Sequence, residues 1–210
     1  MATENSTSKR RNAVKELKRD IILAAARQVF EQEGLEGASL RAIAKAAGYT
    51  PAALYFHFDS KEAVYAELLS RSLDSLRLET ERAIARSDNP ADKMQSAAMA
   101  FFLYYRDNPG DLDLGFYLFR GGMKPHGLGK ERDRQLNREL QHGLQPITDA
   151  AIALGASETK ALEITVSLFA HATGLLLLSH TGRIRIFGVN AEAMMAQFAA
   201  ELTAGITAGA

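Results

Sequence analysis

The chain of 210 residues contains no cysteine and only five prolines. Without cysteine it can form no disulfide, no thiolate metal site and no cysteine nucleophile, which fits a reducing cytoplasm. The first residues are polar and basic with no apolar run behind them, so we expect no signal peptide. The longest apolar stretch, residues 164–178, is interrupted by His171, Thr173 and Gly174 and is short for a membrane span. We therefore expect a soluble, cytoplasmic protein with no membrane partner.

Net charge is also lacking, because 25 Lys and Arg residues balance 25 Asp and Glu residues. This balance argues against attraction of the whole molecule to nucleic acid. Residues 1–19 nevertheless carry a surplus of four positive charges. A basic arm of this kind suits contact with DNA phosphates or with the minor groove. For residues 1–8 a solubilising tail is an equally open interpretation.

Residues 39–58 predict two short helices joined by a tight turn. Ser39 is a favoured N-cap, and the apolar residues that follow it recur at helical spacing. Gly48 suits the left-handed position that ends a helix. Thr50 can cap the second helix, and Pro51 then takes the first helical position, where its missing N–H costs nothing. The second helix carries small, polar and aromatic residues but no charge, which suits insertion between the phosphate walls of a DNA groove. This is a helix-turn-helix pattern.

The remaining sequence predicts helices nearly throughout and contains no hairpin signal. The expected helices cover residues 12–33, 60–86, 90–106, 112–120, a segment through 136–154 that is bent at Pro146, 158–179 and 191–207. Glycines and a proline make 121–129 a loop. Residues 183–187 alternate like a strand, but a single strand has no pairing partner, so we expect a loop there too. The fold class is therefore all-α.

Residues 22–69 resemble the DNA-binding domain of the tetracycline-repressor-like (TetR) family. The resemblance rests on residues 22–26 with Phe30 and Gly34, on 43–44, 47–48 and 54–58, and on 60–62. It implies an N-terminal arm and a three-helix DNA-binding domain with a helix-turn-helix in residues 1–60. For residues 61–210 it implies a helical domain for effector binding and dimerisation.

The resemblance also implies the DNA contacts. Phosphate contacts fall on Ser39, Tyr55, His57 and Lys61, and base-edge contacts on Arg41, Thr50, Pro51, Ala52 and Ala53. Lys61 starts the next helix, whose free N–H groups favour an anion. Many relatives carry a hydroxyl or glycine where this chain has Ala52 and Ala53, and alanine offers only apolar contact to a thymine methyl. Arg41 is therefore the best candidate for a bidentate guanine contact, although a solvated or phosphate-bound side chain is equally open.

The second domain combines an aromatic cluster with an unusually apolar helix. The resemblance implies an effector cavity, for which the candidates are Phe101, Phe102, Tyr105, Phe116, Tyr117, Arg120, Met123 and His171. An ordinary core is the alternative for any one of them. Such a lining favours a mainly apolar, aromatic or acyl-bearing ligand with one polar or anionic group.

Residues 158–179 are apolar around the whole helix, which requires burial on all sides. A symmetric partner can supply that burial in a four-helix interface. The candidates for this homodimer interface are Phe169, Leu175, Leu178, Met195, Phe198 and Leu202. No histidine pair has metal-ligand spacing, and no residue context positions a catalytic group, so we expect no metal, no cofactor and no enzyme.

These features together predict a homodimeric, TetR-like transcription regulator, a repressor rather than an activator, that binds palindromic double-stranded operator DNA. The resemblance implies that a small effector in the second domain releases the operator, which requires different affinities for the two states. Two alternatives stay open. One is a DNA-bound structural or interaction protein without an effector, and the other is a helical enzyme that uses the aromatic cluster.

Overall fold

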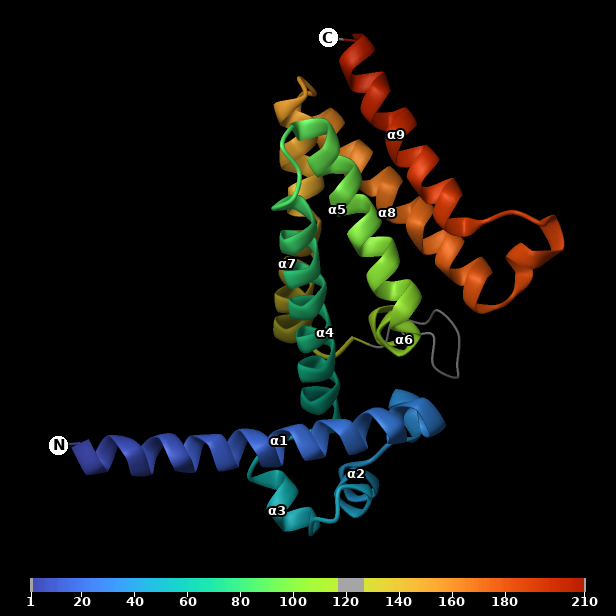
Figure 1. Cartoon of the computed structure of the whole chain (residues 1–210). Helices are drawn as coiled ribbons and strands as arrows, with labels where there is room; N and C mark the ends of the chain where they lie inside the picture. Colours follow the sequence, from blue (N-terminus) through green and yellow to red (C-terminus); the bar gives the residue numbers. More distant parts are fainter. Residues whose placement is uncertain (1, 117–126, 210) are drawn as a thin grey trace. The chain divides into compact units, whose positions relative to one another are not determined.

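The computed structural model describes residues 2–116 and 127–209, and every regular element in these residues is helical (Figure 1). The expected all-α fold class is confirmed. The elements are α1 (Ala2–Gly37), α2 (Leu40–Ala46), α3 (Pro51–Tyr55), α4 (Lys61–Ile84), α5 (Pro90–Asp107), α6 (Pro109–Phe116), α7 (Lys130–Ala153), α8 (Glu158–His180), the 3₁₀ turn η1 (Arg183–Phe187) and α9 (Ala191–Gly209).

The described residues form two compact units. Unit 1 holds residues 2–69, 113–116 and 127–133, and unit 2 holds residues 70–112 and 134–209. Packing therefore divides the chain within α4, after Leu69, rather than at the expected boundary after residue 60. One reason is that the first half of α4 completes the core of unit 1. The buried Tyr65 hydroxyl donates to the Leu114 carbonyl at 2.8 Å, so the end of α6 joins the same unit.

The core of unit 1 forms where α1 packs against α2 and α4. Ile22, Ala26 and Phe30 lie one helical turn apart on α1 and are completely buried. The Phe30 ring meets the Tyr65 ring edge to face, with centroids 5.1 Å apart. α1 begins at Ala2, well before the expected start near residue 12, because no proline or glycine interrupts the segment. At its other end Gly34 has φ of 71°, which breaks the regular helix where the sequence predicted.

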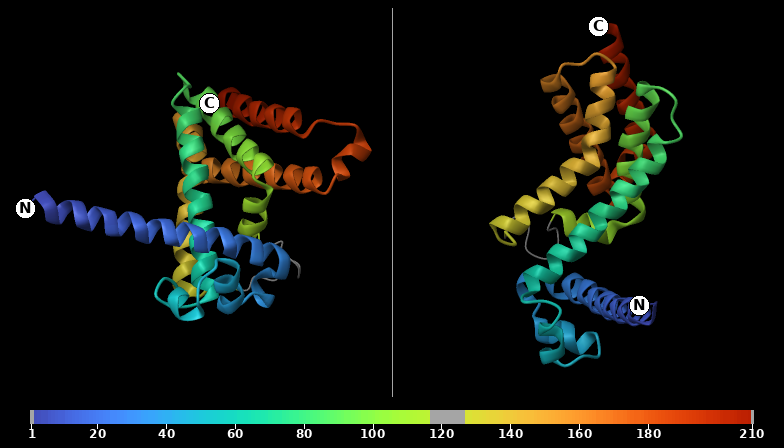
Figure 2. Two further views of the ribbon diagram at one scale, coloured as in Figure 1. Left: turned by 60° about the horizontal axis from the view of Figure 1, so that its bottom comes forward. Right: turned by 90° about the vertical axis from the view of Figure 1, so that its left-hand side faces the viewer.

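The core of unit 2 forms among α5, α8 and α9, which pack against one another and can be followed in both views of Figure 2. Phe102, Leu168 and Met195, one from each helix, are almost fully buried at their contact. α7 joins α8 through buried hydroxyls, because Thr148 Oγ1 lies 2.8 Å from Thr165 Oγ1. α7 continues through Pro146, the position where the sequence predicted a bend within one helix.

The segment between α8 and α9 is a 3₁₀ turn, where the sequence predicted an irregular loop. It is bounded by Gly182 and Gly188, whose φ values of 71° and 63° are left-handed. By length and composition α8 could cross a membrane, a test that core helices of folded domains also pass. In unit 2 its residues Ala161, Leu168 and Leu176 are buried against neighbouring helices.

Candidate nucleic-acid interface

Four local features shape the turn between α2 and α3. Ser39 Oγ accepts from the Ala42 N–H at 3.1 Å and caps α2, and Thr50 Oγ1 accepts from the Ala53 N–H at 3.2 Å and caps α3. Between them Gly48 has φ of 72°, a left-handed value that a side chain would disfavour. Pro51 follows at the first helical position. Each feature lies where the sequence predicted it, so the two helices form a helix-turn-helix.

α3 presents one face to the core of unit 1 and the other to solvent. Leu54 and Phe58 are buried, with 0% and 4% exposure, and hold α3 against the core. Pro51 and Ala52 are exposed and Ala53 is half-buried. The exposed side of α3 is thus small and uncharged at its start, which leaves room for a close approach to a base pair.

Among the described residues of unit 1, Phe56 is the most exposed large apolar side chain, with 89% of its surface accessible. In the sequence Phe56 belongs to the matching motif, but no contact was predicted for it. α3 ends at Tyr55, and this end turns Phe56 away from the buried row. Tyr55 beside it is 58% exposed. The helix end therefore carries two aromatic rings that unit 1 does not cover.

Several of the residues expected to read bases or contact phosphates lie on unit 1 with side chains that solvent can reach. Arg41 is exposed on α2, and no acidic partner pairs with it in the described part of the chain. Ser39 is exposed, and its hydroxyl can still donate while its oxygen caps α2. Lys61 Nζ donates to the Glu36 carbonyl at 2.9 Å, which occupies one of its three N–H donors.

His57 is half-buried behind the exposed end of α3. Its Nδ1 is buried and has no hydrogen-bond partner among the described residues. Burial lowers the pKa of His57, and the positive charges of Arg19, Lys15 and Lys18 lower it further. A neutral imidazole still offers one N–H donor, so contact with a phosphate remains possible without a charge. The positive charges of Lys15 and Lys18 on α1 therefore act on the end of α3.

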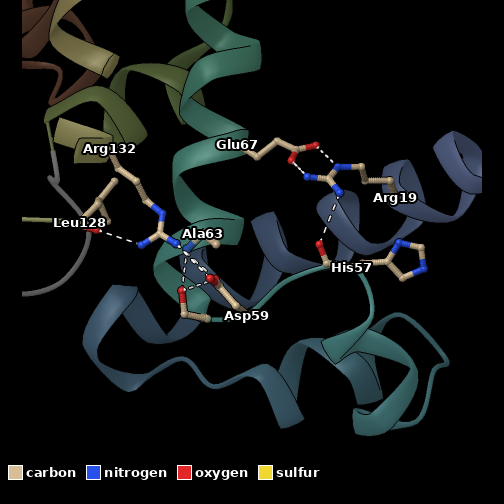
Figure 3. A network of polar contacts seen from close by, with 8 residues as sticks. Arg19, His57, Asp59, Ala63, Glu67, Leu128 and Arg132 are labelled. Carbon is tan, nitrogen blue, oxygen red and sulfur yellow. Dashed lines mark hydrogen bonds and ion pairs between the residues drawn. The ribbon is translucent and has the colours of Figure 1, made fainter. Parts of the chain in front are cut away.

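Arg19 belongs to the frame of unit 1 and not to a free basic arm. Its guanidinium forms an ion pair with Glu67 of α4, and Nη1 donates to the His57 carbonyl at 3.4 Å (Figure 3). The hydrogen bonds to Glu67 are the main reason that the pKa of Arg19 is raised. The guanidinium also lies 4.5 Å from the centre of the Phe58 ring. One side chain therefore holds α1, the end of α3 and α4 together.

A second ion pair links Asp59, just before α4, to Arg132 in the first turn of α7. Arg132 Nη2 lies 3.2 Å from Asp59 Oδ1, and its Nη1 donates to the carbonyl of the buried Leu128 at 3.3 Å (Figure 3). Ser60 Oγ caps α4 by accepting from the Ala63 N–H at 3.1 Å. The ion pair and the cap together fix the connection between α3 and α4. No sequence pattern pointed to the pair of Asp59 with Arg132.

The expected effector residues are divided among unit 2, unit 1 and the residues outside the described part of the chain. Phe101, Phe102 and Tyr105 are buried in unit 2, and the Phe101 ring meets the Tyr105 and Phe169 rings edge to face at 4.9 and 5.4 Å. Phe116 belongs to unit 1. The remaining candidates Tyr117, Arg120 and Met123 lie outside the described residues, as does most of the expected loop 121–129.

His171 and Phe198 form a stacked pair in unit 2, although the sequence predicted an effector role for one and a dimer role for the other. Their ring centroids are 4.0 Å apart and the rings are inclined by 21°. Burial lowers the pKa of His171, while a hydrogen bond to the Met194 backbone opposes that shift. Its Nε2 is buried and unpartnered in the described part of the chain. A neutral His171 thus offers an unused polar atom within an apolar contact.

Two of the expected dimer residues point into the protomer itself. Leu175 and Met195 are only 5% and 0% exposed in the single chain, so a second copy cannot contact them as the helices stand. Phe169, Phe198 and Leu202 are half-buried, and Leu178 is exposed. The solvent side of α8 instead carries the large apolar residues Leu162, Val166, Leu177 and Leu178. Among the described residues no group of three or more His, Asp or Glu could hold a metal ion.

Known proteins resemble this chain at two levels. Residues 22–68 match the model of the family described as bacterial regulatory proteins, tetR family. The transcriptional regulator UidR of Escherichia coli K12 is 38% identical over 71 residues, which cover 34% of this chain and 33% of UidR. The repressor KstR2 of Mycobacterium tuberculosis H37Rv is 35% identical over 85 residues, which cover 40% of this chain and 42% of KstR2. The chain thus matches about a third of the length of UidR and somewhat more of KstR2.

Solved structures resemble almost the whole chain in fold. PfmR, a TetR family regulator of Thermus thermophilus, has a TM-score of 0.66 at 22% identity over 88% of this chain and 95% of PfmR. A tetR family regulatory protein of Rhodococcus RHA1 has a TM-score of 0.68 at 18% identity, over 90% of this chain and 96% of that protein. FadR of Bacillus subtilis, solved with stearoyl-CoA, has a TM-score of 0.68 at 16% identity, over 88% of this chain and 97% of FadR.

The matched residues contain the complete helix-turn-helix described above, together with α1 from Ile22 and the first half of α4. These residues therefore resemble the family both in sequence and in fold. Outside the segments that match UidR and KstR2, the likeness is one of fold alone. The chain is accordingly TetR-like, and its residues 22–68 belong to the tetR family of bacterial regulatory proteins.

Proposed function

We propose that the protein is a homodimeric repressor in the cytoplasm that binds a palindromic operator and releases it when a small effector binds. The observation that carries this proposal is the exposed face of α3, framed by the caps at Ser39 and Thr50 and anchored by Leu54. A short, uncharged helix that projects from a rigid frame suits insertion into a major groove. The family match over the same residues supports it.

Base reading is assigned to α2 and α3, and phosphate contact to the groups around them. Arg41 and Thr50 supply polar contacts, while Pro51, Ala52 and Ala53 supply apolar contact to thymine methyl groups. Tyr55, His57, Lys61 and Ser39 face the phosphates. Lys15 and Lys18 extend that positive surface along α1, since both lie close enough to His57 to lower its pKa. Phe56, with its exposed ring, adds an apolar contact to the sugar or base at the edge of the groove.

Dimerisation is assigned to the solvent side of α8 together with α9. Leu162, Val166 and Leu177 are 58%, 62% and 44% exposed in the single chain. A row of large apolar side chains along one helix marks an interaction surface. A two-fold partner would bury it and would bring two copies of α3 to successive major grooves of one operator.

The effector is assigned to unit 2 and to the class of acyl-bearing or aromatic compounds. The buried rings of Phe101, Phe102 and Tyr105 favour an apolar ligand, and the unpartnered Nε2 of His171 offers one polar anchor. A FadR of the same fold was solved with stearoyl-CoA, which supports an acyl chain. Release follows only if the effector binds the state that cannot span the operator more tightly than the state that can.

Selection of bound duplexes from a random pool tests the DNA claim. We expect enrichment of a palindrome whose half-site centres lie about one helical turn, ~10 bp, or a small multiple apart. The selected duplex is then titrated with long-chain acyl-CoA and, as a control, with free coenzyme A. Release by the acylated compound alone supports the effector claim. A selected palindrome that no acyl compound releases would retain the DNA claim and reject this effector class.

A further inference from the structure

The connection between α8 and α9 ends in an exposed apolar segment, residues 183–189, which we call the tip. Ile186, Phe187 and Val189 are 80%, 72% and 46% exposed. Arg183 and Arg185 are also exposed, and neither has an acidic partner in the part of the chain that the structure describes. A short turn that displays large apolar side chains beside two cations is costly to leave in water, so a partner surface is expected.

A groove lies at the other end of the same helix pair, between the start of α8 and the end of α9. Its volume is about 510 Å³. The residues that matter for its character are the apolar Ile164, Leu202 and Ile206 and the acidic Glu163 and Glu201. Glu163 pairs with Lys160 at 3.1 Å, whereas Glu201 accepts from the Gln197 amide at 2.8 Å and has no cationic partner among the described residues. We call this the end groove.

The tip and the end groove complement each other in charge and in polarity. The tip is cationic and apolar, and the end groove has an apolar lining with two carboxylates against one cation, Lys160. The volume of the groove has room for the side chains of Ile186 and Phe187. The two features cannot meet within one chain, because α8 has 23 residues and is about 35 Å long, and they lie at its opposite ends (Figure 1). They can meet only between two copies.

The direction of pairing follows from the same charges. If two copies of α8 ran parallel, tip would face tip, and the arginines of both copies would repel. A two-fold axis that crosses α8 near its middle makes the pairing antiparallel. Ala170 and Gly174 lie there, both exposed, and a Cβ built on Gly174 would meet nothing within 4 Å, so a second helix can approach closely. Each tip then lies over the end groove of the other copy.

We propose that the tip of each copy inserts into the end groove of a second copy, with Ile186 and Phe187 on Ile164, Leu202 and Ile206, and with Arg183 and Arg185 facing Glu163 and Glu201. The contact occurs twice in an isologous dimer. It clamps both ends of the helix pair, in addition to the packing of α8 along its length. This inference rests on the proposed homodimer and adds to it a specific pair of surfaces.

Site-specific cross-linking of the full chain tests the pairing directly. The sequence has no cysteine, so introduced thiols stand alone. Three variants are compared with a short bis-maleimide: Ile186→Cys, Gly205→Cys, and both together. Gly205 lines the end groove and a Cβ built on it meets nothing within 4 Å, so the fold should tolerate the change. We expect covalent dimer from the double variant and none from either single variant.

Other outcomes of the cross-linking overturn the proposal. Covalent dimer from Ile186→Cys alone would show tip beside tip, the parallel arrangement. A double variant that sediments as a dimer but does not cross-link would reject the insertion while the homodimer stands. A wild-type chain that sediments as a monomer would instead reject the homodimer itself. The failure of this inference and the failure of the proposed function are therefore distinguishable.

A charge at the tip gives a second measurement. Phe187→Asp should raise the dimer dissociation constant by about tenfold or more, because a carboxylate would enter an acidic, apolar groove. The matched control is Leu78→Asp on α4, which places the same charge on an exposed apolar residue of unit 2 that does not line the end groove. The control should dimerise as the wild type does. Equal dissociation constants for both variants and the wild type would contradict the insertion.

Discussion

Arg19 of α1 donates from Nε and Nη2 to the two carboxylate oxygens of Glu67 of α4, with Nε 2.5 Å from Oε1. Two parallel hydrogen bonds between charged groups fix both the distance and the orientation of the two helices. Because the same guanidinium reaches the His57 carbonyl, the end of α3 is fixed by the pair as well. The position of α3 therefore depends on a residue that lies in α1.

Replacement of Arg19 should destabilise unit 1. In Arg19→Ala the partly buried Glu67 carboxylate loses its ion pair with Arg19, so the free energy of unfolding should fall by about 2 kcal/mol. Urea denaturation measures this change. Lys18→Ala is the control, since Lys18 is exposed and neighbours Arg19 in sequence. The double variant with Glu67→Ala should lose less than the sum of the two single losses, and full additivity would contradict the coupling.

Phe56 and Leu54 should separate DNA contact from stability. Phe56→Ala should leave the melting temperature unchanged, because the side chain is 89% exposed, but should weaken operator binding on the order of tenfold, or about 1.4 kcal/mol. Leu54→Ala removes a fully buried side chain and should cost about 2–5 kcal/mol of stability. Thermal unfolding and a mobility-shift titration measure the two effects. Unchanged DNA affinity in Phe56→Ala would remove Phe56 from the interface.

Gly48 should be sensitive to substitution for backbone reasons alone. Its φ is 72°, and a Cβ would meet no atom within 4 Å, so Gly48→Ala introduces strain without a clash. The expected loss of stability is about 1 kcal/mol, with a matching loss of operator affinity as the turn shifts. Gly48→Asn should be milder, because asparagine tolerates the left-handed region. Calorimetric unfolding compares the three proteins, and equal stability of all three would contradict the assigned turn geometry.

His171 should make stability depend on pH. Its pKa is lowered by burial in the folded protein, whereas an unfolded histidine titrates near 6.5. Below about pH 6.5 the unfolded chain binds more protons, so stability is complete at higher pH and falls as the pH decreases. His171→Phe keeps an aromatic ring stacked on Phe198 and removes the pH dependence of stability that His171 contributes. The pH dependence that remains includes the contribution of His57, whose pKa burial also lowers. Denaturation at about pH 7 and pH 5.5 tests it, and an unchanged slope would contradict the assignment.

The helix-turn-helix could be predicted because its signals are local. The caps at Ser39 and Thr50, the left-handed Gly48 and Pro51 each act within four residues of themselves. The network around that motif could not be predicted in the same way. Arg19 and Glu67 are 48 residues apart, and Asp59 and Arg132 are 73 apart. Residues so far apart show no periodic spacing in the sequence that would indicate their pairing. The local charge pattern alone therefore predicts that Arg19 belongs to a basic arm.

The second domain shows a different limit. A helix that is apolar on all sides must be buried, but hydropathy does not say whether its own chain or a second copy covers each side. Hydropathy therefore predicts Leu175 in the dimer interface, although it lies in the core, while Leu162 and Val166 on the other side of α8 are exposed. Phe56 illustrates the same point at α3. Its exposure depends on where the helix ends, which a motif alone does not specify.

The ratio of specific to non-specific affinity is the most direct measure of whether α2 and α3 read a DNA sequence. The wild-type chain is titrated, at one physiological salt concentration, with its selected palindrome and with a duplex of the same composition in scrambled order. We expect the palindrome to bind at least about 10³-fold more tightly. Equal binding of both duplexes, with the same dependence on salt, would show that the helix-turn-helix does not read sequence.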